Sequence, residues 1–311
     1  MTPPMELTGT NSSAIAAEFL RARRRAGSPA MGMVMTLVIV ADEDVADEAM
    51  TAAQAAAQEH PARLLGVVLG DGRGAARVDA KVGIGSGASG ERALIRLSGP
   101  VTRHPESVVL PLLLPDSPVV VWWPGRAPDD PAADPLGSLG RRRITDAAAV
   151  PTGRAKAMLT QCRAYAPGNT DLAWTRVTQW RALLAAALDQ NPGKVSSVSV
   201  TSERISPSAD LLSAWLADRL GVKVDRHHSE GPGITQVLLR TRAGEVAIDR
   251  SDGKLATLRS PGQPDRPVAL RRRTTEELLS EELRRLDPDD VYAATVKRML
   301  KMSGGNVRGR Q

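Results

Sequence analysis

Three glycines, Gly85, Gly87 and Gly90, spell GxGxxG, a pattern that in dinucleotide-binding proteins holds a pyrophosphate at a helix N-terminus. That chemistry requires a strand before the loop and a helix after it. Residues Arg92 to Ser98 are instead typical of a strand, and the acidic residue expected about twenty positions later is replaced by Leu110. The pattern therefore predicts a glycine-rich turn between two strands, and we expect no bound cofactor.

The histidines and the single cysteine do not form a metal-binding pattern. His227 and His228 are adjacent, so on a strand their side chains point to opposite faces. No other histidine lies at ligand spacing nearby, and neither does Cys162, the only cysteine. We expect no metal site, no intrachain disulfide and no dithiol switch. The sequence also contains no P-loop, HExxH or GxSxG motif, so we expect no catalytic activity.

Two adjacent tryptophans, Trp122 and Trp123, end a run of valines and precede Pro124-Gly125. Neighbouring side chains on a strand face opposite sides. The turn that follows places both rings at the carboxyl end of the strand, which is the edge where ligands bind in open α/β sheets. Two interpretations stay open: helices bury both rings, or one ring lies exposed at a binding edge.

The segment Thr170 to Asp189 gives the strongest helical signal in the chain. Arg176 projects from its broad apolar face, and Trp174 and Arg181 lie at the edges of that face. A guanidinium on an apolar face needs a carboxylate or carbonyl partner. That partner is either an acid within the fold, such as Asp171, or an acid on another protein.

Tryptophan and arginine are enriched among the residues that dominate binding energy in protein interfaces. We therefore predict a partner-binding surface that includes, or is supported by, seven residues: Trp122, Trp123, Asp171, Trp174, Arg176, Trp180 and Arg181. The alternative is that the same side chains join two parts of the fold.

The elements that position these residues predict an α/β fold followed by an α+β fold. Met33 to Ala41 and Arg63 to Gly70 are apolar runs typical of buried parallel strands, and Glu43 to Gln58 between them is typical of a helix. This βαβ unit predicts an α/β sandwich with a mostly parallel sheet over residues 12–165. Several glycine-bounded runs after residue 195 predict antiparallel strands in an α+β domain over residues 168–302. Residues 1–11 and 303–311 are expected to be a flexible and a disordered tail.

Charge and composition exclude several classes of function. The formal net charge is +6, but the basic runs are short and scattered, and aromatic residues make up only 3% of the chain. Nucleic-acid binding requires a clustered basic face, so we expect no nucleic-acid partner. No 18-residue apolar run predicts a membrane span, and the N-terminus lacks the apolar core of a secretory signal. Together with the single thiol, this predicts a cytoplasmic protein.

Four segments carry a resemblance to a known family: Leu37 to Ala41, Val109 to Gly125, Arg143 to Ala147 and Thr170 to Asp189. They resemble the actinobacterial branch of the OpcA family, over about residues 12–300. The resemblance implies a non-catalytic assembly factor and allosteric activator of glucose-6-phosphate dehydrogenase, the entry enzyme of the oxidative pentose phosphate pathway. It supplies no set of binding residues and leaves any small-molecule effector unknown. The alternative is an enzyme or sensor that binds a sugar phosphate or nucleotide at the open edge of the N-terminal sheet.

Overall fold

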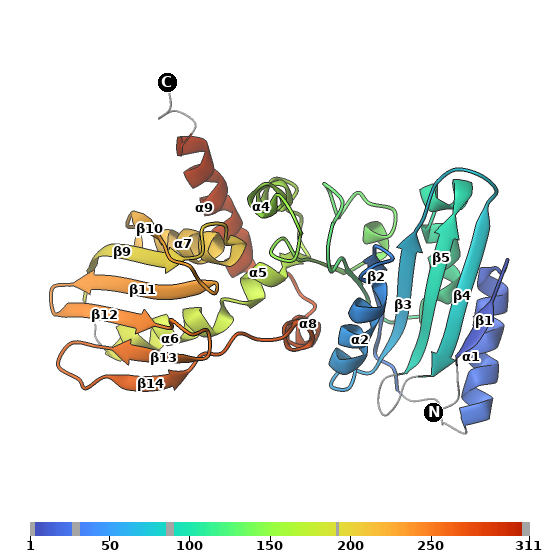
Figure 1. Ribbon diagram of the computed structural model, residues 1–311, viewed down its shortest axis with the longest axis horizontal. Helices are drawn as coiled ribbons and strands as arrows, with labels where there is room; N and C mark the ends of the chain where they lie inside the picture. Colours follow the sequence, from blue (N-terminus) through green and yellow to red (C-terminus); the bar gives the residue numbers. More distant parts are fainter. Residues whose placement is uncertain (1–3, 27–31, 85–89, 191–192, 307–311) are drawn as a thin grey trace. The chain divides into compact units, whose positions relative to one another are not determined.

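A computed structural model describes residues 4–26, 32–84, 90–190 and 193–306 (Figure 1). The chain divides into two compact units. The first contains Met1–Asp146, Gly168–Thr170 and Thr275–Pro288, and the second contains Ala147–Pro167, Asp171–Thr274 and Asp289–Gln311. The predicted boundary near residue 165 stays a prediction; by their contacts, residues 147–167 pack with the second unit and residues 275–288 pack with the first.

The first unit is built on a mixed sheet whose strand order is β1-β4-β5-β3-β2-β6-β7-β8 among the described residues. The pairs β2–β3, β3–β5, β2–β6 and β6–β7 are parallel, whereas β4 is antiparallel to both β1 and β5. The mostly parallel sheet that the sequence predicted is confirmed. The strands are β1 Met5–Leu7, β2 Met35–Ala41, β3 Ala62–Leu69, β4 Arg77–Ile84, β5 Glu91–Ser98, β6 Val119–Trp122, β7 Arg142–Thr145 and β8 Asn169–Asp171.

Helices α1 (Ser12–Ala26) and α2 (Ala46–Ala56) cover opposite faces of this sheet (Figure 1). Leu65 and Val67 of β3 share a core with the α1 side chains. Gly66 between them points the other way, because a Cβ there would lie 2.7 Å from the Sδ atom of Met50 in α2. The predicted βαβ unit is thus confirmed. The remaining helical segments of this unit are α3 Glu106–Val109, α8 Thr275–Arg284, and the 3₁₀ turns η1 Gly99–Arg103, η2 Leu110–Leu112 and η3 Gly137–Leu139.

The N-terminal segment that the sequence predicted as a flexible tail contributes the edge strand β1. Met5–Leu7 pairs antiparallel with β4. The backbone N–H of Gly9 donates to Asp79 Oδ1 at 2.9 Å, and that of Thr10 donates to the Val78 carbonyl at 2.8 Å. These bonds to a distant strand fix the segment, so the prediction was wrong for this part of the chain.

Two other predictions concern segments at the limits of the described residues. Helix α9 (Asp290–Asn306) extends past the predicted end near Met302, and the rest of the predicted disordered tail, residues 307–311, lies outside the described residues. Gly85 and Gly87 of the GxGxxG pattern also lie outside them. The strand β5 begins at Glu91, directly after Gly90, where a dinucleotide site would need a helix.

The second unit contains a sheet with strand order β10-β9-β11-β12-β13-β14 among the described residues. Only the β9–β10 pair is parallel there, so the predicted α+β domain with antiparallel strands is confirmed. The strands are β9 Val195–Ser202, β10 Val224–His228, β11 Ile234–Thr241, β12 Gly244–Asp249, β13 Leu255–Arg259 and β14 Arg266–Ala269. The helices are α4 Arg154–Arg163, α5 Leu172–Thr175, α6 Thr178–Gln190, α7 Pro207–Leu220 and α9.

Local signals explain the helix α7, which packs on β9 and β10. The Ser206 side chain accepts a hydrogen bond from the Ala209 N–H, and Pro207 occupies the first helical position. Gly221 follows the last turn with a φ of 67°, a left-handed conformation that glycine adopts at little cost. Because β9 and the other strands of this sheet turn one apolar face towards the helices, the core of the second unit lies between the two layers.

Candidate functional site

The segment Thr170 to Asp189, predicted as one helix, contains the end of strand β8, the short helix α5 and most of the longer helix α6. Asp171 caps α5, since its Oδ1 accepts from the Ala173 N–H at 2.8 Å and its Oδ2 from the Ala147 N–H at 3.0 Å. Between α5 and α6, the Val177 N–H donates to the carbonyl of Trp174, three residues back. This tighter turn separates the two helices, so the prediction of one continuous helix was wrong.

Five of the seven residues predicted for the partner-binding surface are buried: Trp122, Trp123, Asp171, Trp174 and Trp180 each expose 2% or less of their surface. Trp123 belongs to the core of the first unit, and Trp174 and Trp180 belong to that of the second. The Nε1–H of Trp174 donates to Asp289 Oδ2 at 2.8 Å. These buried side chains cannot meet a partner directly. In a surface contact, their role would be to hold neighbouring exposed residues in position.

Arg176 and Arg181 are the two predicted residues that lie partly exposed. The guanidinium carbon of Arg181 lies 3.6 Å from the centroid of the Trp174 ring, and one of its nitrogens donates to Thr178 Oγ1 at 3.0 Å. A buried tryptophan thus orients a surface cation. The assignment of the seven residues to a partner interface stays a prediction, with Arg176 and Arg181 as its accessible members.

A pocket of about 190 Å³ lies in the second unit, and Arg176, Val177 and Trp180 form part of its wall. The wall also includes residues from α4, from the N-terminal end of α7 and from the segment after β14. Among the described residues, one carboxylate lines the pocket, that of Glu203. Six arginines line it: Arg154, Arg176, Arg250, Arg271, Arg272 and Arg273. The pocket is therefore strongly electropositive.

Arg250 is the most deeply buried of these arginines, with 5% of its surface exposed. Its terminal nitrogens donate to the carbonyls of Leu270 at 2.9 Å and Ile234 at 2.8 Å, and its guanidinium carbon lies 5.0 Å from the Trp180 ring centroid. Its Nε is buried without a hydrogen-bond partner, and within the described parts of the chain it forms no ion pair. Burial, together with the charge of Arg272, lowers the pKa of Arg250 to about 10, so it remains a cation at neutral pH.

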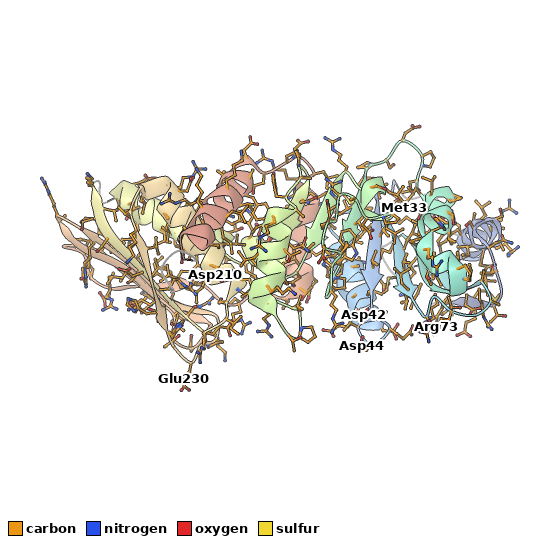
Figure 2. The ribbon with its side chains drawn as sticks, turned by 90° about the horizontal axis from the view of Figure 1, so that it is seen from above. Met33, Asp42, Asp44, Arg73, Asp210 and Glu230 are labelled. Atoms are coloured by element: carbon orange, nitrogen blue, oxygen red, sulfur yellow. The ribbon has the colours of Figure 1, made fainter. Side chains whose placement is uncertain are left out.

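The N-terminal end of α7 adds to the positive potential of the pocket. Ser206, Pro207 and Ser208 lie in the wall, where the helix dipole contributes a partial positive charge. Asp210 in the first turn of α7, labelled in Figure 2, is not part of the wall. Its Oδ1 lies 3.4 Å from a guanidinium nitrogen of Arg226, which offsets its negative charge.

Sequence reasoning did not find this pocket, because its arginines lie far apart along the chain. In the sequence, Arg271 to Arg273 form one of several short, scattered basic runs, and no local pattern marks Arg154 or Arg250. The triple-arginine run next to a strand was the available signal. Only the packing of α6 and α7 with the loops of the sheet brings that run beside Arg250 and Arg176.

The open edge of the first sheet has a different electrostatic character. Asp42 and Asp44 follow the carboxyl end of β2, Arg73 follows that of β3, and all three are exposed (Figure 2). Two carboxylates repel an anionic ligand, so this edge suits a sugar phosphate less well than the pocket of the second unit does.

No helix in the described residues is both long and apolar enough to cross a membrane. No group of three or more histidine, cysteine or acidic side chains there is arranged to hold a metal ion.

Two protein-family models match the chain. One is described as the glucose-6-phosphate dehydrogenase subunit N-terminal domain and matches residues 53–164; the other, described as the C-terminal domain of that subunit, matches residues 167–296. Together they cover more than half of the chain. No curated protein matches it. A solved structure of an oxidoreductase from Sinorhizobium meliloti aligns over 89% of each chain with 10% identity and a TM-score of 0.40, a likeness that carries no argument about function.

Proposed function

Because the chain belongs to the OpcA family of glucose-6-phosphate dehydrogenase subunits, we propose that it binds glucose-6-phosphate dehydrogenase and assists its assembly. The observation that carries the proposal is the pair of family models, which match the chain in the order N-terminal domain, then C-terminal domain. We further propose that the protein is cytoplasmic and has no catalytic activity of its own.

The proposed mechanism is allosteric activation through direct binding. A subunit that binds the active conformation of the dehydrogenase more tightly than the inactive one shifts the population towards the active form. A tenfold shift requires a difference in binding free energy of only about 1.4 kcal/mol. A single interface of ordinary size is enough for such a difference.

The proposed contact includes the surface around Arg176 and Arg181. Arg181 is held over the Trp174 ring, so it loses little conformational freedom when it meets an acidic side chain of the partner. The buried tryptophans hold the α5–α6 backbone in place behind it. This arrangement fits an interface in which oriented arginines contact carboxylates and buried aromatic residues keep them in position.

Charge reversal tests this surface. We expect Arg181→Glu to raise the Kd for glucose-6-phosphate dehydrogenase about tenfold or more. The loss of an oriented arginine at an interface costs about 1–2 kcal/mol of binding free energy or more. Arg242→Glu is the matched control, since Arg242 is an exposed arginine on the turn between β11 and β12 of the same unit. Biolayer interferometry with immobilised dehydrogenase gives both constants. Equal affinities for the two variants would remove Arg181 from the interface.

A further inference from the structure

The arginine-lined pocket of the second unit has the features of an anion-binding site. Six guanidinium groups and one carboxylate line it among the described residues, and the positive end of the α7 dipole adds to the same potential. Arg154 and Arg272 form no ion pair within the described parts of the chain. An anion in the pocket would offset the charge of these two arginines.

Arg250 is preorganised for such an anion. Two backbone carbonyls and the Trp180 ring fix its guanidinium, so binding costs little further ordering. Its burial removes the water that would weaken an electrostatic attraction. The two carbonyls and the charge of Asp252 offset only part of its charge, because no carboxylate forms an ion pair with it in the described residues. A buried cation without an ion-pair partner lowers the stability of the fold, so its position in a pocket wall indicates a role in ligand binding.

We propose that this pocket binds the phosphate group of a small phosphorylated metabolite. Arginine forks match the geometry of phosphate oxygens, and a dianion uses several guanidinium groups at once, whereas one or two satisfy a carboxylate. The helix N-terminus that forms part of the wall favours the same ligand.

The dimensions of the pocket restrict the size of the ligand. A volume of about 190 Å³ is below the roughly 300–1,000 Å³ of pockets for drug-sized ligands, so it suits a phosphate group with few further atoms. A second, more open hollow shares Gln179, Arg271 and Arg272 with the first, so the two adjoin. We place the phosphate beside Arg250 and the organic part of the metabolite over Arg271 and Arg272.

Titration calorimetry on the full chain at low ionic strength tests the site without any dehydrogenase present. The probes are inorganic phosphate and the monoester glycerol 3-phosphate, with succinate as a dicarboxylate control at equal ionic strength. We expect both phosphates to bind with a Kd below about 1 mM and succinate to bind at least about tenfold more weakly. Arg272→Gln removes an exposed pocket arginine, and Arg242→Gln is the matched control outside the pocket.

The variants locate the site. We expect Arg272→Gln to weaken glycerol 3-phosphate binding about tenfold and Arg242→Gln to change it less than about twofold. Arg250→Gln should abolish binding, and circular dichroism shows whether that variant folds; Arg272 is exposed, so its variant tests the site even if Arg250→Gln does not fold. Undetectable phosphate binding at about 10 mM, equal binding of succinate, or equal effects of Arg272→Gln and Arg242→Gln would each overturn the proposal. Because the assay uses the isolated chain, its outcome is separate from that of dehydrogenase binding.

Discussion

Cys162 illustrates how burial decides the chemistry of a residue. The side chain is 1% exposed, and its Sγ lies 3.7 Å from the Sδ of Met299. Burial, and to a lesser degree the charges of Asp171 and Asp210, raises the pKa of the Cys162 thiol to about 12. The thiolate is the reactive form, so the folded protein presents no nucleophilic sulfur at physiological pH.

We therefore expect native protein to be inert towards a chromogenic disulfide reagent at mildly alkaline pH and to react with one equivalent after denaturation in guanidinium. Absorbance of the released thiolate follows both reactions. Rapid labelling of the native protein would contradict the burial of Cys162. It would also mean that Cys162 could take part in thiol-based regulation. Because the chain has one cysteine, such regulation would require a thiol on another molecule.

Glu18 in α1 gives the fold a pH dependence. Its side chain is 1% exposed, and it accepts hydrogen bonds from Arg21, at 2.7 Å, and from Arg25. Burial acts to raise the pKa of Glu18, but the bonds from Arg25 and Arg21 outweigh it and hold the pKa below the ordinary value of 4.5. A carboxyl with a depressed pKa stabilises the folded state above its unfolded pKa, and this contribution disappears as the pH falls through the folded value.

We expect Glu18→Gln to lower the free energy of unfolding at neutral pH by about 1–3 kcal/mol, because it removes charged hydrogen bonds in a buried setting. The difference from the unmodified protein should shrink below pH 4.5, where Glu18 is protonated first in the unfolded state, and it should disappear as the pH falls through the lower pKa of the folded state. Urea unfolding followed by circular dichroism over a pH series measures both effects. A difference that stays constant down to strongly acidic pH would rule out this ionised pair.

At the scale of elements, a buried ion pair holds α8 in the first unit. Arg142 of β7 is 4% exposed, Glu282 of α8 is 7% exposed, and their side chains pair. Arg142 also donates to the Asp287 carbonyl at 2.9 Å. The helix returns to this unit from far along the chain, and its apolar residues Leu278, Leu279 and Leu283 are buried.

Removal of one partner leaves a buried charge uncompensated, so we expect Glu282→Ala to lower the free energy of unfolding by about 3–5 kcal/mol. Arg284→Ala on the same helix is the control, because its pair with Glu59 lies on the surface and contributes little. Chemical unfolding of both variants gives the comparison. Equal stabilities would show that Arg142 and Glu282 do not hold α8 in place.

The sequence predicted those elements whose signals are local. The β-branched apolar runs predicted β2 and β3, and Ser206, Pro207 and Gly221 are local signals of the same kind at the ends of α7. Three other features depend on contacts between distant residues. Strand β1 is too short to carry a pattern, and the break between α5 and α6 follows from packing. Helix α8 belongs to the first unit although it follows residues 171–274 of the second in the sequence.

The same distinction applies to the candidate site. The sequence predicted Arg176 and Arg181 as surface contacts because a guanidinium on or beside an apolar helical face needs a partner. The burial of both Trp122 and Trp123 was one of two interpretations that the strand pattern left open. The pocket could not be predicted, because its arginines come from elements that are separate in the sequence and meet only in the folded second unit.

At the scale of the whole molecule, two proposed capacities belong to one chain: binding of glucose-6-phosphate dehydrogenase and binding of a phosphorylated small molecule in the second unit. Arg176 is common to the proposed contact surface and to the pocket wall. A ligand in the pocket is therefore placed to change the surface that the partner meets. Any such coupling is reciprocal, so the partner would change the affinity for the ligand by the same factor.

Direct binding to the dehydrogenase is the central claim, and one titration tests it most directly. The purified protein is added stepwise to the glucose-6-phosphate dehydrogenase of the same organism while NADPH formation is followed and a parallel sizing column with light scattering reports complexes. We expect a saturable rise in rate that tracks the appearance of a co-migrating complex. No complex and no change in rate, with both proteins in the micromolar range where a contact of about −8 kcal/mol is half saturated, would contradict this claim.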